Sequence, residues 1–182
     1  MMLSSLVQEL ITLHAKRTKI RLSMNLIYFV PISKKPIIAV TGTVGKTTVV
    51  SLLSQILKQS MHICTGGNIG RGMLELIKEQ EISDAVLLEL SSFQLERTTK
   101  FAPELAIWTN FSANHIDWHE NEKNYFIAKQ NIMRHQQAGQ KALLPLNLIE
   151  QFSHLHKKTA QWYAFSQKSP LDKASWKLLL IL

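Results

Sequence analysis

Cysteine is almost absent from this sequence of 182 residues, in which Cys64 is the single example. One cysteine excludes an internal disulfide and a zinc site built from cysteine ligands, and it fits a protein of the reducing cytoplasm. Long apolar runs are missing as well. No run is long enough to span a bilayer, and no small-residue cleavage site follows a hydrophobic segment, so we expect neither stable membrane insertion nor a signal peptide.

Acidic residues are scarce, since 13 Asp and Glu stand against 21 Lys and Arg, which gives a net charge of +8. The excess lies in residues 1–35 and 151–182, and the segment between them is close to neutral. Basic and aromatic residues do not alternate in the way that is typical of single-strand binding. The sequence therefore predicts no nucleic-acid partner. Its hydrophobic fraction of 46% is that of a globular domain.

A glycine-containing loop lies between an apolar run at residues 36–40 and apolar positions with helical spacing at 49–57. These patterns predict a strand and a helix. The loop, residues 41–48, reads Thr-Gly-Thr-Val-Gly-Lys-Thr-Thr. Its glycines allow main-chain N–H groups to converge on phosphate oxygens at the start of the helix. We therefore predict a nucleoside triphosphate site formed by Gly42, Thr43, Val44, Gly45, Lys46, Thr47 and Thr48.

The loop also allows a plainer interpretation. A full P-loop has a glycine five residues before its second glycine, and this chain has Val40 there. An ordinary turn with a solvated Lys46 is the alternative. In the nucleotide-binding interpretation Lys46 is a catalytic charge on the terminal phosphates, and the Thr47 hydroxyl is a Mg²⁺ ligand.

Further apolar segments alternate with helical patterns along the chain. Strands are predicted at residues 61–65, 84–90, 105–109, 141–145 and 160–166, with a helix at 72–79. This alternation predicts an α/β fold with a mostly parallel sheet flanked by helices. Because ligands bind at the carboxyl ends of such strands, we expect Glu89 to lie beside the loop, where its carboxylate could coordinate Mg²⁺. The alternative is a strand-end Glu89 that points into water.

A polar cluster follows the strand predicted at residues 105–109. His115, Asp117 and His119 lie within five residues, and a zinc site is one interpretation, although no fourth ligand is close in the sequence. The next predicted helix spans residues 125–132 and carries Lys129. From the sequence alone, Lys129 is an ordinary solvated lysine of a helix surface.

Several motifs, in a shared order, resemble those of the Mur ligases, the amide-forming ligases of peptidoglycan synthesis. They are the loop at 41–48, Gly-Asn-Ile-Gly at 67–70, Leu-Glu-Leu-Ser-Ser-Phe-Gln-Leu-Glu at 88–96, and Tyr-x-x-Ala-Lys-x-x-Ile at 125–132. The resemblance covers roughly residues 25–166. It departs at Val44, where the family usually has Asn or His. The Phe-Gln-Leu-Glu continuation is similar to the branch that adds D-glutamate to UDP-N-acetylmuramoyl-L-alanine.

The resemblance implies ATP and Mg²⁺ as cofactors and amide bond formation through an acyl phosphate. It places this reaction in cell wall biogenesis, a process on which cell shape and cell division depend. It implies UDP-N-acetylmuramoyl-L-alanine and D-glutamate as substrates. The implied catalytic residues are Lys46, His115 and Lys129. The implied Mg²⁺ ligands are Thr47, Glu89, His115 and a carbamylated Lys129. The residues implied near the substrate or the metal loop are Asn68, Ser91 and Gln94.

We expect three segments along the chain. Residues 1–35 are expected to be the remnant of a preceding domain with a linker, residues 36–166 part of a Mur ligase central ATP-binding domain, and residues 167–182 an apolar and basic tail. The parts that hold the UDP-sugar, adenine and the incoming amino acid are expected to be missing, and a complementary chain that supplies them is left open. Alternatives are a non-catalytic nucleotide-binding remnant, an interaction module, or another Mur or folylpolyglutamate-type ligase.

Overall fold

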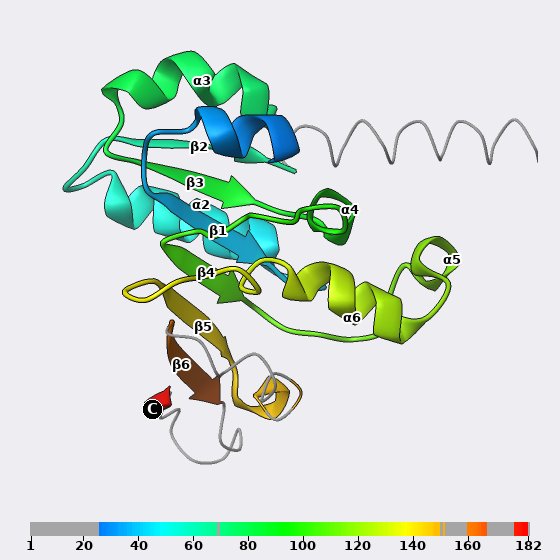
Figure 1. The fold of residues 1–182 in the computed structure, drawn as a ribbon. Helices are drawn as coiled ribbons and strands as arrows, with labels where there is room; N and C mark the ends of the chain where they lie inside the picture. Colours follow the sequence, from blue (N-terminus) through cyan, green and yellow to red (C-terminus); the bar gives the residue numbers. More distant parts are fainter. Residues whose placement is uncertain (1–25, 69, 150, 152–159, 167–176, 182) are drawn as a thin grey trace, which may run out of the picture.

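The computed structural model describes residues 26–68, 70–149, 151, 160–166 and 177–181. These residues include one seven-stranded sheet in the order β2-β3-β1-β4-β5-β6-β7 (Figure 1). The strands are β1 (Ile37–Thr41), β2 (Ile63–Gly67), β3 (Ala85–Glu89), β4 (Leu105–Trp108), β5 (Lys141–Pro145), β6 (Gln161–Ser166) and β7 (Lys177–Ile181). Neighbouring strands from β2 to β6 pair in parallel, and β7 pairs antiparallel with β6. The predicted α/β fold with a mostly parallel sheet is confirmed.

Helices cover both faces of the sheet (Figure 1). They are α2 (Lys46–Leu57), α3 (Leu76–Glu79), α4 (Ser92–Leu95), α5 (Ile116–His119) and α6 (Glu122–Gln130), with 3-10 turns η1 (Met73–Glu75), η2 (Gln80–Ile82) and η3 (Leu146–Leu148). Successive side chains of β1 alternate between the two faces, as the pleat of a strand requires. Ala39 belongs to the core shared with α3, whereas Val40 belongs to the core shared with α2. The result is a three-layer α/β/α arrangement.

The helix predicted at residues 72–79 differs from its predicted form, because it consists of η1, one turn of α3 and η2 in succession. The helix predicted from the apolar positions at 49–57 is present as α2, but two of those positions, Leu52 and Ile56, are 54% and 59% exposed. Six apolar positions in nine residues spread over more of a 3.6-residue helix than the sheet can cover. The side that packs on the sheet therefore holds Val50 and Leu53 and leaves those two outside.

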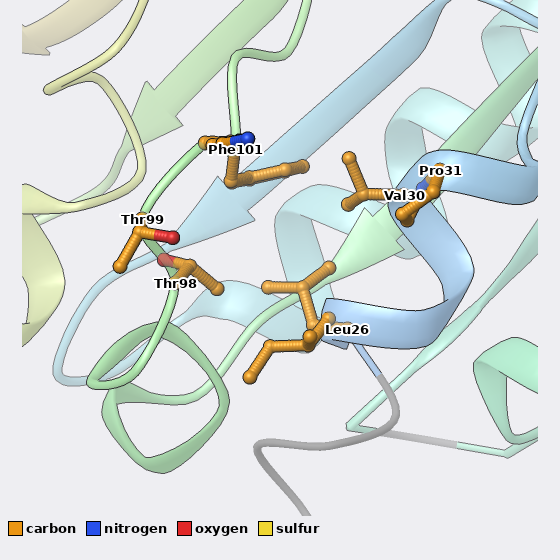
Figure 2. A pocket seen from close by; sticks show the side chains of 8 residues that line it. Leu26, Val30, Pro31, Thr98, Thr99 and Phe101 are labelled. Carbon is orange, nitrogen blue, oxygen red and sulfur yellow. The ribbon is translucent and has the colours of Figure 1, made fainter.

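Residues 26–32 are helical and contribute to the core. Leu26 and Phe29 are fully buried in the cluster that also holds Trp108. A small apolar cavity of about 140 Å³ lies between this helix and residues 98–101 (Figure 2). β7 likewise adds residues of the expected tail to the sheet. The segment boundaries at residues 35 and 166 stay predictions. Within the described residues, no helix combines the length and the apolar character needed to cross a bilayer.

Candidate functional site

The loop between β1 and α2 lies at the carboxyl edge of the sheet, where β1 is flanked by β3 and β4. The chain reaches β3 through the outer strand β2 and then returns to the other side of β1, so this edge is a topological switch point of the kind that binds ligands. Gly42 and Gly45 have φ angles of 154° and 77°. A Cβ atom on Gly42 would collide with the side chain of Thr109. Glycine is therefore required at position 42 by space as well as by backbone conformation.

The first turn of α2 is available to an anion. Gly45 is the N-cap, and no side chain of the described residues caps the helix there. The first turn also contains no acidic residue. Four N–H groups at a helix start have no partner within the helix, and the helix dipole adds a partial positive charge. Such a helix start favours phosphate oxygens.

Lys46 folds back over the loop. Its Nζ donates hydrogen bonds to the carbonyl oxygens of Gly42 and Thr43, each at 3.0 Å. Burial lowers the pKa of Lys46, and the carboxylate of Glu89 acts in the opposite direction. The ammonium group is thus placed directly above the loop, where it can exchange these carbonyl oxygens for phosphate oxygens.

Glu89 lies buried beside the loop at the end of β3, with 1% of its surface exposed. Its Oε1 accepts a hydrogen bond from Asn68 Nδ2 at 3.2 Å, and its Oε2 has no hydrogen-bond partner among the described residues. Glu89 and Thr47 line one cavity of about 290 Å³, together with Ser51 and Thr65. The alternative of a Glu89 pointing into water is wrong. A buried carboxylate oxygen beside a hydroxyl is a donor set that fits Mg²⁺.

Lys129 is buried, so its interpretation as a solvated lysine is also wrong. It is 1% exposed on α6, and its Nζ donates to the carbonyl oxygen of Gly42 at 2.7 Å. The Nζ lies 4.8 Å from the ring centroid of Tyr125, whose hydroxyl donates to Thr43 Oγ1 at 3.3 Å. Burial, and then the charge of Lys46, lower the pKa of Lys129 from 10.5 to about 7. Helix α6 therefore contacts the loop through two side chains.

His115 and His119 have different surroundings. His115 is exposed at the start of α5 with a φ of 54°, and its ring lies 5.1 Å from that of Phe93. Partial desolvation by its neighbours, and then the charges of Lys129 and Lys46, lower the pKa of His115, which favours the neutral imidazole that binds metals. His119 is 2% exposed, with its Nε2 2.9 Å from Ser92 Oγ.

The zinc interpretation of His115, Asp117 and His119 is wrong. The described part of the chain contains no group of three His, Cys, Asp or Glu side chains that could hold a metal ion. The physical reason is that His119 is buried, with its Nε2 beside Ser92 Oγ and its Nδ1 3.6 Å from Glu96 Oε1, whereas His115 is exposed. The predicted Mg²⁺ site, with Thr47 and Glu89 as oxygen ligands, stays a prediction.

The residues predicted near the substrate have structural partners. Asn68 bonds the carboxylate of Glu89. Ser91 and Gln94 form a capping box at the start of α4, in which Gln94 Oε1 accepts from Ser91 N at 2.8 Å and Ser91 Oγ accepts from Gln94 N at 3.3 Å. Gln94 is 1% exposed. Contact of these three residues with a substrate stays a prediction.

Thr109 and Asn110, which the motifs did not indicate, bond the tip of the loop. Both follow β4, the strand that pairs with β1 on the side opposite β3. Their position in the sequence is the signal that could have indicated them. Because β4 is parallel to β1, polar residues directly after β4 must lie at the same carboxyl edge of the sheet as the loop that follows β1.

The strand, glycine loop and helix, with half-buried Lys46 at a switch point of a parallel sheet, define a P-loop α/β protein. A family model described as "Mur ligase middle domain" matches residues 40–178. The chain belongs to the Mur ligase family, whose members are ligases.

Two curated relatives share one name. A protein of Acetivibrio thermocellus named "UDP-N-acetylmuramoylalanine--D-glutamate ligase" is 36% identical over 172 residues, covering 93% of this chain and 36% of its own length. A protein of Clostridium acetobutylicum with the same name is 45% identical over 112 residues, covering 61% of this chain and 24% of its own length. The chain therefore spans a minor part of these relatives.

Solved structures share the fold. The MurF ligase of Thermotoga maritima in complex with ADP superposes with a TM-score of 0.61 at 14% identity, over 90% of this chain and 44% of that one. FolC of E. coli in complex with ADP gives a TM-score of 0.54 at 15% identity, over 88% of this chain and 50% of that one. At these identities the likeness concerns the fold alone.

Proposed function

We propose that this chain provides the ATP-binding part of a cytoplasmic ligase that joins D-glutamate to UDP-N-acetylmuramoyl-L-alanine in peptidoglycan synthesis. The observation that carries the proposal is the convergence of charged groups on one loop. Lys46 and Lys129 both donate to the carbonyl oxygen of Gly42, and Glu89 brings a buried carboxylate to the same strand edge. The names of the relatives and the run at residues 88–96 support the choice of substrates.

In this proposal the loop and the first turn of α2 hold the phosphates of ATP. Lys46 would exchange its two carbonyl partners for oxygens of the terminal phosphates, and Thr47, Glu89 and His115 would hold Mg²⁺. Bound ATP and Mg²⁺ supply the phosphoryl group that activates the substrate carboxylate as an acyl phosphate and the positive charge that stabilises its transfer. Asn68 orients Glu89 through the hydrogen bond to Oε1.

Lys129 is proposed to be carbamylated. Because its pKa is about 7, a large share of the side chain is uncharged at neutral pH. The neutral amine is the form whose nitrogen attacks carbon dioxide, with loss of a proton. The resulting carbamate carries the anionic oxygens that a Mg²⁺ site needs. Ser91 and Gln94, at the start of α4, are proposed to contact the muramoyl substrate.

Isothermal titration calorimetry of the purified chain with ATP, with and without Mg²⁺, tests the nucleotide site. We expect saturable, Mg²⁺-dependent binding that is lost in Lys46→Ala. Lys58→Ala is the matched control, because Lys58 is an exposed lysine at the other end of α2. A folded wild-type chain that does not bind ATP would contradict the proposal.

A second candidate is a nucleotide-binding module without turnover. The N–H groups of Thr43 and Val44 already donate to Asn110, so fewer loop donors face a ligand. A phosphate-release assay with UDP-N-acetylmuramoyl-L-alanine and D-glutamate tests this candidate. Release that needs both substrates would refute a module without turnover, whereas ATP binding without such release is the result that the module predicts.

A further inference from the structure

The tip of the phosphate loop is bonded to the side chain of Asn110. Asn110 Oδ1 accepts hydrogen bonds from Thr43 N at 3.2 Å and Val44 N at 3.0 Å. Asn110 Nδ2 donates to the carbonyl oxygen of Val44 at 2.9 Å, and Thr109 Oγ1 donates to the same oxygen at 2.9 Å. Both the oxygen and the nitrogen of the carboxamide therefore form hydrogen bonds with the main chain of the loop tip.

Asn110 is itself fixed to the core. Its carbonyl oxygen accepts from Trp108 Nε1 at 2.9 Å and from Thr43 N at 3.1 Å. Trp108 is fully buried and is paired with Thr41 of β1. The carboxamide thus extends from a rigid strand pair and cannot shift without disturbing the core.

Packing does not explain how the tip keeps its conformation. The side chain of Val44 is 61% exposed. The hydrogen bonds from Asn110 and Thr109 are instead polar contacts that hold a glycine-flanked segment, which otherwise has wide backbone freedom. They also satisfy the N–H groups of Thr43 and Val44, so the donors left for a phosphate are those at the start of α2.

We propose that Asn110 is a positioning residue that sets the conformation of the phosphate loop before a nucleotide polyphosphate binds. The consequence for affinity rests on the proposed function. A loop that is already ordered loses little conformational freedom when its ligand arrives, whereas a loose loop must be ordered at the expense of binding. Removal of the carboxamide should therefore weaken the binding of any polyphosphate at this site, whatever base it carries.

Amide hydrogen exchange tests the hold on the loop directly. We expect Asn110→Ala to speed exchange at Val44, whose N–H loses the carboxamide oxygen, and to affect Thr43 less, because Thr43 N keeps the main-chain oxygen of residue 110. Exchange in β1 should be unchanged as evidence that the sheet is intact. Asn110→Asp keeps oxygen acceptors for the two N–H groups but loses the donor to Val44, so its exchange should be intermediate. Asn147→Ala, in an exposed turn at η3, is the control and should match the wild type.

Calorimetry with ATP and with inorganic tripolyphosphate tests the consequence. Asn110→Ala should raise both dissociation constants by the same factor, about tenfold, and Asn147→Ala should change neither. Two exchange results would overturn the assignment: unchanged exchange at Val44 in Asn110→Ala, or exchange in Asn110→Asp that is as fast as in Asn110→Ala. Faster exchange in Asn110→Ala combined with unaltered affinity for both ligands would also overturn it. If the wild type binds neither ligand, the proposed function fails, and the exchange data still decide whether Asn110 holds the loop.

Discussion

Replacement of Lys129 by methionine should change how the stability of this protein depends on pH. The lysine is 1% exposed, and burial with the charge of Lys46 lowers its pKa from 10.5 to about 7. Methionine is flexible, unbranched and uncharged, so it fills a similar space while removing the titration. The comparison therefore isolates the ionisation of one buried amine.

The sign and size of the effect follow from proton linkage. Between pH 7 and 10.5 the unfolded chain keeps a proton on Lys129 that the folded chain has lost, so the free energy of unfolding rises with pH in this window. The free energy of unfolding rises with pH by at most about 1.4 kcal/mol per pH unit for one such group. Because the folded side chain is about half protonated at the start of the window, the gain over the first two pH units is about 2 kcal/mol. Below the window both states are protonated and this gain is absent.

Urea unfolding in buffers free of carbon dioxide measures the effect. The free energy of unfolding of the wild type minus that of Lys129→Met should increase by about 2 kcal/mol from about pH 7 to about pH 9, since other groups cancel in the difference. Lys123→Met is the control, because Lys123 is exposed on the same helix, and its difference from the wild type should stay flat. A flat difference for Lys129→Met as well would refute the inference that burial depresses this pKa.

Two further substitutions test the loop and its surroundings. Gly42→Ala should destabilise the fold more than Gly139→Ala. Both glycines have a positive φ, but only a Cβ atom at position 42 meets the side chain of Thr109. Equal melting temperatures for the two variants would contradict this expectation. Ser92→Ala should cost about 1–3 kcal/mol in urea unfolding, since buried His119 Nε2 loses the hydroxyl at 2.9 Å. A cost below about 0.5 kcal/mol would show that this contact is dispensable.

Much of the fold and part of the site could be predicted from local pattern. The alternation of apolar strands with helical spacing predicts a parallel sheet, and in such a sheet all carboxyl ends meet at one edge. That rule alone brings Glu89 next to the loop at residues 41–48, as observed through the pairing of Val40 with Glu89. The glycine positions follow from the turn that the loop must make.

The contacts that complete the site could not be predicted in this way. Lys129 reaches Gly42 across 87 positions of the chain, and Asn110 reaches Val44 across 66. Neither residue differs in its local pattern from a solvated lysine or a loop asparagine. The burial of Lys129 depends on how α6 packs against the sheet, and the role of Asn110 depends on the pairing of β4 with β1. Both are properties of the assembled layers.

The charge arrangement of the loop is tied to ligand binding. Without carbamylation, the amino groups of Lys46 and Lys129 share the carbonyl oxygen of Gly42, and burial, followed by the charge of Lys46, lowers the pKa of Lys129. Loss of the Lys129 proton relieves part of the repulsion between two cations in a partly desolvated site. A phosphate at the start of α2 would add negative charge beside both amines, whose positions are already fixed by the shared carbonyl oxygen. This arrangement favours an anionic ligand and links the charge of the loop to ligand binding, since preorganised charges need little rearrangement when that ligand binds.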